Sequence, residues 1–376
     1  FPYDYLIPSQ YSDLAKDVEI DDRILLADGT LEFKVNKIID TEIECTVVYG
    51  GILSNHKGIN LPGVKVSVPS LTKKDKADAK LALDLGVDFL ALSFVRSASD
   101  IQDLKELINA HSGNALIIAK IEKPEALDNA DEILEVADGI MVARGDLGVE
   151  LNPEQVPVAQ HQLIDLARKK FKPVIVATQM LESMIENARP TRAEVTDVAY
   201  AVTLGTDAIM LSGETAVGAF PVDAVKMMDR IARQTESYLW TNNAYGSKVR
   251  YDSSKAAIPI WDAIANSMSQ LAHDLRVRAV VVISKSGMSA ATMSSARPAA
   301  PVIAITKTMD VCQKILMHWG IVPVLSNDIE ETNFSDLARN IVVEKKLALK
   351  GQKVLLVQGF QNDDALNKPS VTVLTI

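Results

Sequence analysis

The chain contains 376 residues, of which 48% are hydrophobic, and carries a formal net charge of −10 at pH 7. This length allows two or three domains with separate cores, and the acidic charge argues against a general binder of nucleic acids or of membrane surfaces. Two isolated cysteines, Cys45 and Cys312, and no apolar run near the roughly 18 residues of a transmembrane helix predict a reduced, cytoplasmic protein.

Residues 1–63 have the pattern of a small β domain. Three short segments have strand character, namely Arg23 to Leu26, Leu31 to Ile38 and Glu42 to Tyr49. The turn dipeptides Asp28-Gly29 and Gly50-Gly51 separate or follow these segments. We therefore expect the chain to begin with short β-strands and to leave this domain near residue 63.

Residues 64–241 contain five units in which an apolar strand is followed by polar residues and then by a helix-like stretch. The strands lie within Asp88–Arg96, Ala115–Leu127, Asp138–Glu150, Lys172–Met180 and Asp207–Thr215. Such a run of parallel βα units is typical of a (β/α)8 TIM barrel, an α/β fold whose catalytic groups collect at the carboxyl ends of the strands. Because a closed barrel of this type needs eight strands, the five units predict a partial barrel.

Local signals mark the ends of several barrel helices. The segment Thr191 to Glu194 is a capping box, and we expect its helix to run to about Leu204 with Gly205 as its stop. Pro157 and Pro221 are expected in the first turns of two further helices.

Residues 242–376 are predicted to form a separate, open α/β domain. The weakly patterned segment from Asn242 to Lys255 is the expected linker. Beyond it, apolar strands alternate with helical stretches, and a last strand closes the chain. The predicted strands are Ala279–Ile283, Val302–Ile305, Val322–Leu325, Lys353–Val357 and Val371–Ile376.

Charged residues interrupt the second barrel strand where it ends. Ala115 to Ala119 is an unbroken apolar run, and alternation sends the following Lys120 and Glu122 to the same side of the strand. An ion pair that closes the strand and a catalytic pair at the barrel mouth both agree with this pattern. The other strands also end in polar groups, which are Arg144, Gly145 and Asp146, then Thr178, then Ser212 and Glu214.

Longer motifs around these residues resemble the pyruvate kinase family, in the same order and at similar intervals. They are NHKGINLPG, IIAKIE, GIMVARGDLGVE, VIVATQMLESM, RPTRAEVTDVA and AIMLSGETAVGAFP. The resemblance covers essentially the whole chain and implies a TIM barrel with an inserted β domain and a carboxyl-terminal regulatory domain. In that family the β domain follows the third barrel strand, so the resemblance leads us to expect three further strands upstream of Phe1.

The resemblance implies transfer of a phosphoryl group from phosphoenolpyruvate to ADP, which gives pyruvate and ATP. Glu122 and Asp146 offer two hard oxygen ligands suited to Mg²⁺ or Mn²⁺, and no histidine or cysteine nearby suggests zinc. Carried over by motif, Lys120 stabilises the phosphoryl group in flight and the enolate it leaves. A K⁺ site would lie in the segment expected upstream.

The other roles follow from the same motifs, and each has a structural alternative. The turn from Ala143 to Asp146, which includes Arg144 and Gly145, offers backbone N–H groups to the substrate carboxylate. Thr178 resembles a threonine that contacts this carboxylate, Ser212 and Glu214 resemble groups that relay a proton, and Lys57 resembles a lysine that approaches the nucleotide phosphates. Alternatively, Thr178 caps a helix, Ser212 with Glu214 begins one, Arg144 pairs with a carboxylate or crosses a subunit contact, and Lys57 is simply solvated.

A loop in the last domain resembles the sugar-phosphate site of the family. It comprises Ser284, Lys285, Ser286, Gly287, Met288 and Ser289, between a strand and a helix. The expected partner loop near Gly359 carries Asp363 and Asp364, which would repel a second phosphate, so a monophosphate effector or none is favoured. The resemblance further implies a homotetramer. The alternatives are an inactive regulatory paralogue and another metal-dependent, enolate-forming barrel enzyme.

Overall fold

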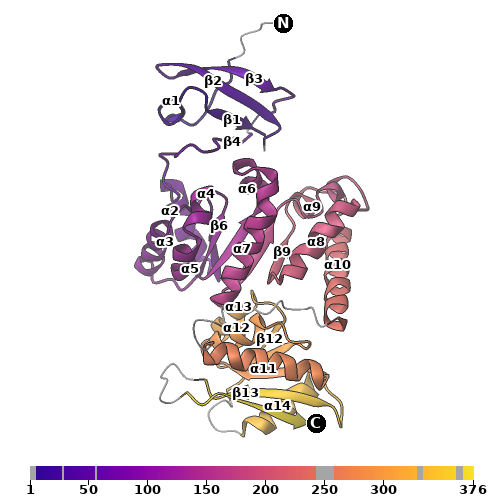
Figure 1. The fold of residues 1–376 in the computed structure, drawn as a ribbon. Helices are drawn as coiled ribbons and strands as arrows, with labels where there is room; N and C mark the ends of the chain where they lie inside the picture. The colour runs from indigo at the N-terminus through magenta and orange to yellow at the C-terminus, as the bar shows by residue number, and fades with distance from the viewer. Residues whose placement is uncertain (1–5, 28, 56, 243–257, 328–332, 361–366) are drawn as a thin grey trace.

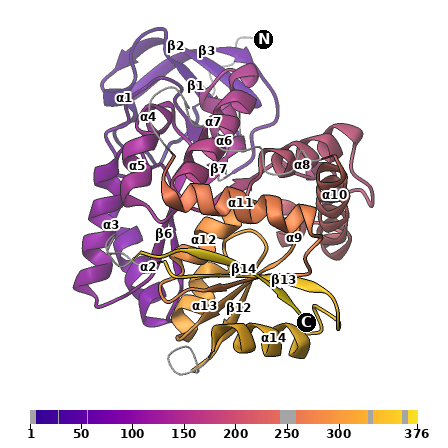
Figure 2. The ribbon, with the colours of Figure 1, turned by 60° about the horizontal axis from the view of Figure 1, so that its bottom comes forward.

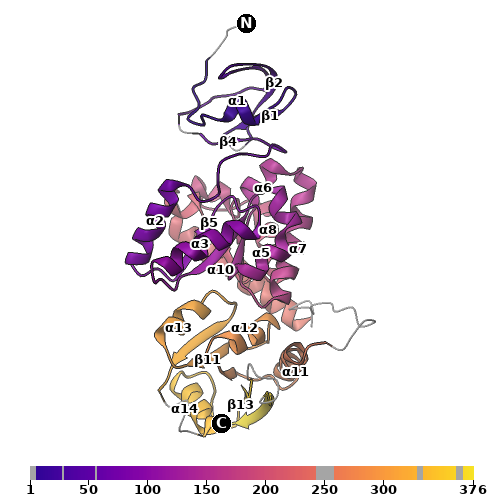
Figure 3. The ribbon, with the colours of Figure 1, turned by 90° about the vertical axis from the view of Figure 1, so that its left-hand side faces the viewer.

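The computed structural model describes residues 6–27, 29–55, 57–242, 258–327, 333–360 and 367–376. Three sheets, within residues 23–60, 89–210 and 280–375, form three parts that follow one another in a row (Figures 1 and 3). Figure 1 places the first sheet above the carboxyl ends of the central strands and the last sheet below their amino ends.

The first part is a four-stranded antiparallel sheet in the order β3-β2-β1-β4. Its elements are α1 (Leu14–Asp17), β1 (Arg23–Leu26), β2 (Leu31–Ile39), β3 (Glu42–Tyr49) and β4 (Ile59–Asn60). The three predicted strands are therefore confirmed. The short β4 pairs with β1 through Asn60 opposite Leu25, which ties the end of this part back to its beginning.

The central part contains five parallel strands in the order β5-β6-β7-β8-β9, as the five βα units predict. The strands are β5 (Phe89–Leu92), β6 (Leu116–Ile121), β7 (Gly139–Ala143), β8 (Val174–Ala177) and β9 (Ala208–Met210). Within the described ranges β5 and β9 each pair with one neighbour, so the sheet is not closed. The helices are α2 (Lys73–Asp84), α3 (Ala98–Ala110), α4 (Pro124–Asp128), α5 (Ala130–Val136), α6 (Arg144–Glu150), α7 (Val156–Lys169), α8 (Arg192–Leu204), α9 (Gly213–Ala216) and α10 (Pro221–Thr241), with the 3-10 turns η1 (Pro153–Gln155) and η2 (Glu182–Ile185).

The predicted helix signals have the expected geometry. The Thr191 side chain accepts the Glu194 N–H while the Glu194 carboxylate accepts the Thr191 N–H, so the capping box is complete. Gly205 ends α8 in the left-handed conformation, with φ of 84°. Pro221 begins α10, and α7 begins at Val156, one residue before Pro157.

Side-chain alternation in β6 positions the site. Ile117, Ala119 and Ile121 belong to the large core between the sheet and its helices, whereas Ile118 packs with Met141 and Ile175 on the opposite face. Lys120 has the same parity as Ile118 and therefore leaves the strand on that opposite face. The helices thus cover one face of the sheet, and the charged end of β6 belongs to the other.

The last part is an open α/β sheet in the order β12-β11-β10-β13-β14, in which β14 runs antiparallel. Helices α11 and α12 share a core with one face of this sheet, and α14 packs on the other face (Figure 2). The elements are α11 (Ile260–Asp274), β10 (Val280–Ile283), α12 (Met288–Ser295), β11 (Val302–Thr306), α13 (Met309–Ile315), β12 (Ile321–Leu325), α14 (Phe334–Glu344), β13 (Lys353–Gln358) and β14 (Ser370–Thr375). All five predicted strands are present, whereas nearly all of the expected linker from Asn242 to Lys255 lies outside the described residues.

Buried polar contacts join the last part to the base of the central sheet. Arg297 and Asp207 form an ion pair at 3.0 Å, with side chains 0% and 4% exposed. Asp207 also accepts the Trp319 backbone N–H at 3.0 Å, so the residue before β9 is fixed by the carboxyl-terminal part. Across the described residues, the helices do not combine the length and apolar character that crossing a membrane would require.

Candidate active site

Lys120 and Glu122 meet at the carboxyl end of β6, as alternation predicts. The Lys120 Nζ forms an ion pair with Glu122 Oε1 and donates a hydrogen bond to Ser93 Oγ at 2.8 Å. The Glu122 side chain is 1% exposed, whereas that of Lys120 is 24% exposed. The lysine therefore lies between a buried carboxylate and the outside, where a bound anion could reach it.

The Glu122 carboxylate is held through both of its oxygens. Oε2 accepts the Phe94 backbone N–H at 2.7 Å, while the buried Oε1 pairs with the Lys120 ammonium. The β6–β7 register pairs Ile121 with Val142, so Glu122 and the turn that carries Asp146 lie at neighbouring strand ends. Within the described ranges no group of three or more His, Cys, Asp or Glu could hold a metal by itself. Two carboxylates completed by water and substrate oxygens suit Mg²⁺ in particular.

The turn after β7 is joined to the turn after β8. Ala143 is the last residue of β7, and α6 starts directly after it. The Gly145 N–H donates to Thr178 Oγ1 at 2.7 Å, and the Thr178 hydroxyl donates to the Ala177 carbonyl at 2.6 Å. A Cβ at Gly145 would lie 3.2 Å from Thr178 Oγ1, so glycine permits this close approach. The two residues predicted to hold one carboxylate are therefore in direct contact.

The Arg144 side chain is buried and joins the turn after β8 to α8. Its Nη1 lies 2.6 Å from both carboxylate oxygens of Asp197 on α8, and its Nη2 donates to the Thr178 carbonyl at 2.8 Å. This arrangement agrees with the ion-pair alternative for the side chain.

Thr178 and Gln179 adopt left-handed backbone conformations, with φ of 68° and 52°. Positive φ is costly for a β-branched residue, and such strain collects at functional sites. Thr178 is not a helix cap, because η2 begins at Glu182 with Leu181 as its N-cap residue. The strained turn instead places the Thr178 hydroxyl against Gly145.

Ser212 and Glu214 lie at the start of α9, and Glu214 is 1% exposed. Its Oε2 accepts the Ser212 N–H at 2.8 Å, and its Oε1 accepts the Leu181 N–H at 3.0 Å. Ser212 is the N-cap residue of α9, in agreement with the structural alternative for this pair. Glu214 thus connects the turns that follow β8 and β9.

The remaining candidates lie apart from these strand ends in the chain. Lys57 is exposed and lies two residues before β4. In the effector candidate, Ser284 is 1% exposed and its Oγ accepts the Ala290 N–H at 3.4 Å, Gly287 has φ of 91°, and Lys285 and Ser286 are exposed. Ser289 is partly buried at the start of α12. Asp363 and Asp364 lie outside the described residues, so their predicted effect on a second phosphate stays a prediction.

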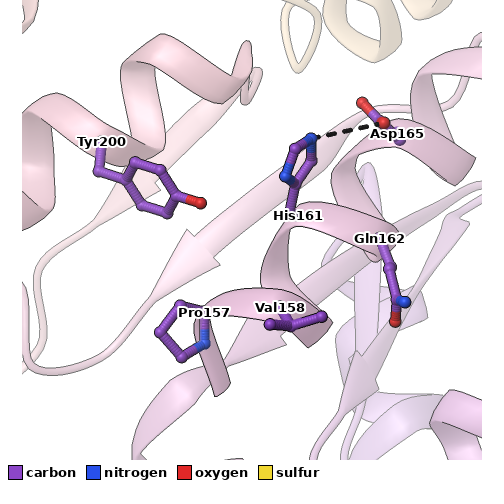
Figure 4. A pocket seen from close by; sticks show the side chains of 6 residues that line it. All are labelled: Pro157, Val158, His161, Gln162, Asp165 and Tyr200. Carbon is purple, nitrogen blue, oxygen red and sulfur yellow. Dashed lines mark ion pairs between the residues drawn. The ribbon is translucent and has the colours of Figure 1, made fainter. Parts of the chain in front are cut away.

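A surface pocket of about 280 Å³ lies between α7 and α8 (Figure 4). Figure 4 shows Tyr200 from α8 opposite α7 residues, among them His161, which pairs with Asp165 at 3.5 Å. The pocket is built from helices and shares no residue with the strand ends described above.

Two contributors to the site were missed by the sequence analysis. Asp197 holds Arg144 although the two are 53 residues apart, and nothing in the local sequence links them. Phe94, with φ of 54°, turns its N–H toward Glu122. In the sequence, only the position of Phe94 directly after the polar end of β5 indicated that it could contribute to the site.

Comparisons with known proteins agree with this geometry. The family described as "Pyruvate kinase, barrel domain" matches residues 4–225, and "Pyruvate kinase, alpha/beta domain" matches residues 262–368. The chain belongs to the pyruvate kinase family. It is 44% identical to a pyruvate kinase of Geobacillus stearothermophilus over 353 residues, which are 93% of this chain and 60% of that protein. It is also 44% identical to pyruvate kinase 2 of a Synechocystis species, covering 93% of this chain and 58% of that one.

Solved structures give the same family. A crystal structure of a pyruvate kinase from Cryptosporidium parvum superposes with a TM-score of 0.83 at 37% sequence identity, covering 96% of this chain and 74% of that one. The predicted family and fold class are therefore confirmed. The chain spans about 60% of the length of the Geobacillus stearothermophilus pyruvate kinase.

Proposed function

We propose that this pyruvate kinase family member transfers a phosphoryl group from phosphoenolpyruvate to ADP, giving pyruvate and ATP. The observation that carries the proposal is the pairing of Lys120 with the buried Glu122, beside the turn that carries Asp146. Phosphoryl transfer depends mainly on positioned cations and carboxylate-held metal, and these residue types supply both.

In this proposal Glu122 and Asp146 hold Mg²⁺ or Mn²⁺. When bound, the metal would neutralise charge on the phosphoryl oxygens. Lys120 is held by Ser93 and Glu122 while its side chain stays 24% exposed, so it can stabilise negative charge on the moving group without reorganising. The backbone around Arg144 and Gly145, together with the Thr178 hydroxyl, is proposed to orient the substrate carboxylate, which would replace the contacts that the Gly145 N–H and the Thr178 hydroxyl make in this structure.

Protonation of the enolate carbon is assigned to the turn after β9. Ser212 is partly exposed there, and Glu214 fixes its backbone N–H at 2.8 Å. Because both Glu214 oxygens already accept backbone N–H groups, the contribution of Glu214 is to position Ser212. Lys57 is proposed to approach the nucleotide phosphates from the β domain.

Further parts of the proposal rest on the family likeness alone. They are a K⁺ requirement, a homotetrameric assembly, a cytoplasmic location and a phosphorylated effector at Ser284 to Ser289. An inactive regulatory paralogue is the competing function, but the Lys120 and Glu122 pair with the strained Thr178 turn favours an active site.

The test is metal-dependent formation of pyruvate from phosphoenolpyruvate and ADP by the full-length protein. Lys120→Met should lower kcat by several orders of magnitude, since it removes the positive charge. Methionine is chosen because it keeps much of the side-chain length. Lys74→Met, which removes an exposed lysine paired with Asp78 on α2, is the matched control and should leave kcat unchanged. A loss below about tenfold in Lys120→Met, or roughly 1.4 kcal/mol, would reduce Lys120 to a structural ion pair.

A further inference from the structure

The turn that follows β5, residues 93–96, contacts both charged residues at the end of β6, and we call it the β5 turn. Ser93 Oγ accepts a hydrogen bond from Lys120 Nζ at 2.8 Å, and the Phe94 backbone N–H donates to Glu122 Oε2 at 2.7 Å. With Oε2 held in this way, Oε1 is the oxygen that pairs with Lys120. The β5 turn therefore fixes the direction of the Glu122 carboxylate.

Arg96, at the end of the β5 turn, binds the linker segment, which we define as residues 66–70 between β4 and α2. Its Nη1 donates to the Val66 carbonyl at 2.7 Å and its Nη2 to the Val68 carbonyl at 3.1 Å. The Arg96 backbone is itself fixed to the central part, because its N–H donates to Asp100 on α3 at 2.8 Å. The guanidinium therefore ties two carbonyls of the linker segment to the strand ends.

Ser70 connects the linker segment to the β5 turn at a second place. Its hydroxyl donates to the Phe94 carbonyl at 2.8 Å, while the Phe94 N–H binds Glu122. Phe94 has φ of 54°, a left-handed conformation that is costly for a bulky residue and persists only where its surroundings impose it. The hydrogen bonds of its N–H and its carbonyl supply this restraint. Loss of the Ser70 hydroxyl should therefore loosen the N–H that holds Glu122.

The β domain also holds the linker segment, which descends from β4 to α2 in Figure 1. Asp17, the last residue of α1, accepts the Ser67 N–H at 2.9 Å and the Ser67 hydroxyl at 3.1 Å through its Oδ2. Val66 packs on the core of the β domain, whereas Leu71 belongs to the core of the central part. Ser67 lies between the two residues whose carbonyls bind Arg96, so both parts of the molecule hold the same three residues.

We propose that the β5 turn couples the attachment of the β domain to the position of the Glu122 carboxylate. Arg96 and Ser70 are positioning residues in this account, because they act through Phe94 and do not touch the reacting groups. A displacement of the linker segment changes the restraint on Phe94, and with it the hydrogen bond to Glu122 Oε2. This coupling is independent of any activity, whereas its effect on a bound metal rests on the function proposed above.

Hydrogen–deuterium exchange of the full-length protein, without metal or substrate, tests the coupling, since the Phe94 amide is the group that binds Glu122. In Ser70→Ala and in Arg96→Met, peptides that span residues 92–96 should exchange at least about threefold faster, the effect of weakening roughly one hydrogen bond. Asp17→Ala, a change within the β domain, should raise the same exchange at least about twofold. Strands β6 to β8 should keep their protection in all three variants.

Two matched controls remove comparable hydrogen bonds elsewhere. Asn36→Ala removes a 2.8 Å hydrogen bond to Thr46 within the β domain, and Ser269→Ala removes a 3.0 Å hydrogen bond to the Ala296 carbonyl in the last part. Both controls should leave the exchange of residues 92–96 unchanged.

The coupling would be overturned by unchanged exchange of residues 92–96 in Asp17→Ala, or in both Ser70→Ala and Arg96→Met. Equal acceleration in the two controls would overturn it as well.

Mn²⁺ binding, measured by electron paramagnetic resonance, separates the coupling from the proposed function. Ser70→Ala should weaken binding about threefold, less than the roughly tenfold loss expected when Glu122→Gln removes the ligand itself. An affinity that falls in Glu122→Gln but not in Ser70→Ala would overturn the effect on the metal. Faster exchange with unaltered Mn²⁺ affinity in both variants would support the coupling and count against Glu122 as a metal ligand.

Discussion

Replacing Arg297 with methionine should destabilise the junction between the central sheet and the carboxyl-terminal part by about 3 kcal/mol. The Arg297 side chain is fully buried and donates to Asp207 at 3.0 Å, to the Ser294 carbonyl at 2.9 Å and to the Gly205 carbonyl. Breaking a buried ion pair by removing one partner costs about 3 to 5 kcal/mol, because the other charge stays buried. In the variant the Asp207 carboxylate still accepts hydrogen bonds from the Trp319 and Val174 backbone N–H groups, each at 3.0 Å. The remaining buried charge is therefore partly compensated, and the lower end of the roughly 3 to 5 kcal/mol range applies.

Urea unfolding followed by tryptophan fluorescence suits this measurement. Trp319 lies 5.4 Å from the Arg297 guanidinium and 6.0 Å from Trp240 between ring centroids, so two of the three tryptophans report on the junction. Arg233→Met is the matched control, since it breaks an Arg–Asp pair whose side chains are 77% and 54% exposed and should cost less than about 1 kcal/mol. Arg297→Lys keeps the charge but loses the planar fork and should fall between the two. An Arg297→Met cost no larger than that of Arg233→Met would refute the reasoning.

Three further predictions concern the metal, a helix cap and pH. Glu122→Gln and Asp146→Asn should each weaken Mn²⁺ binding at least about tenfold, since each removes a charged ligand. Electron paramagnetic resonance measures the binding, and an unchanged circular dichroism spectrum shows that the fold is kept. Unaltered binding in both variants would contradict the ligand assignment. Thr191→Ala should cost about 1 kcal/mol of unfolding free energy by removing the side-chain cap of α8, whereas Thr196→Ala within the same helix should cost less. Burial lowers the pKa of His318 in the folded protein. Below about pH 6.5 the unfolded chain therefore binds a proton that the folded chain does not, so the free energy of unfolding decreases as the pH is lowered. His318→Gln should therefore remove up to about 1.4 kcal/mol of the wild-type stability difference between pH 7.5 and 5.5, and an identical pH profile would show that His318 does not cause it.

The elements that could be predicted from sequence are those encoded by neighbouring residues. Five apolar runs became β5 to β9 because strands buried on at least one face need such runs, and Thr191 and Gly205 fixed the ends of α8 through contacts within a few residues. Lys120 and Glu122 met because alternation within one strand decides their side.

Features that depend on distant partners could not be predicted from sequence. Several roles for the Arg144 side chain were left open by the sequence, because its carboxylate partner Asp197 lies on another helix, 53 residues away. Likewise, no local pattern reveals the left-handed Thr178, because threonine ordinarily avoids that conformation and only the surrounding turns impose it. Lys123 and Glu150 are each unremarkable charged residues until the fold buries them together.

The strand-end turns form one connected series, which changes how substitutions in this site should be interpreted. Phe94 N–H binds Glu122 across 28 residues, Lys123 pairs with Glu150 across 27, Gly145 N–H binds Thr178 across 33, and Leu181 N–H binds Glu214 across 33. Each contact links one turn to the turn after the next strand, from β5 to β9. Loss of Glu214 would therefore release the turn that holds Thr178, and through it Gly145. A reduced rate in a Glu214 variant would follow from that displacement even if Glu214 never exchanges a proton with substrate. Both KM and kcat of the variant must therefore be measured before the lower rate is attributed to proton transfer.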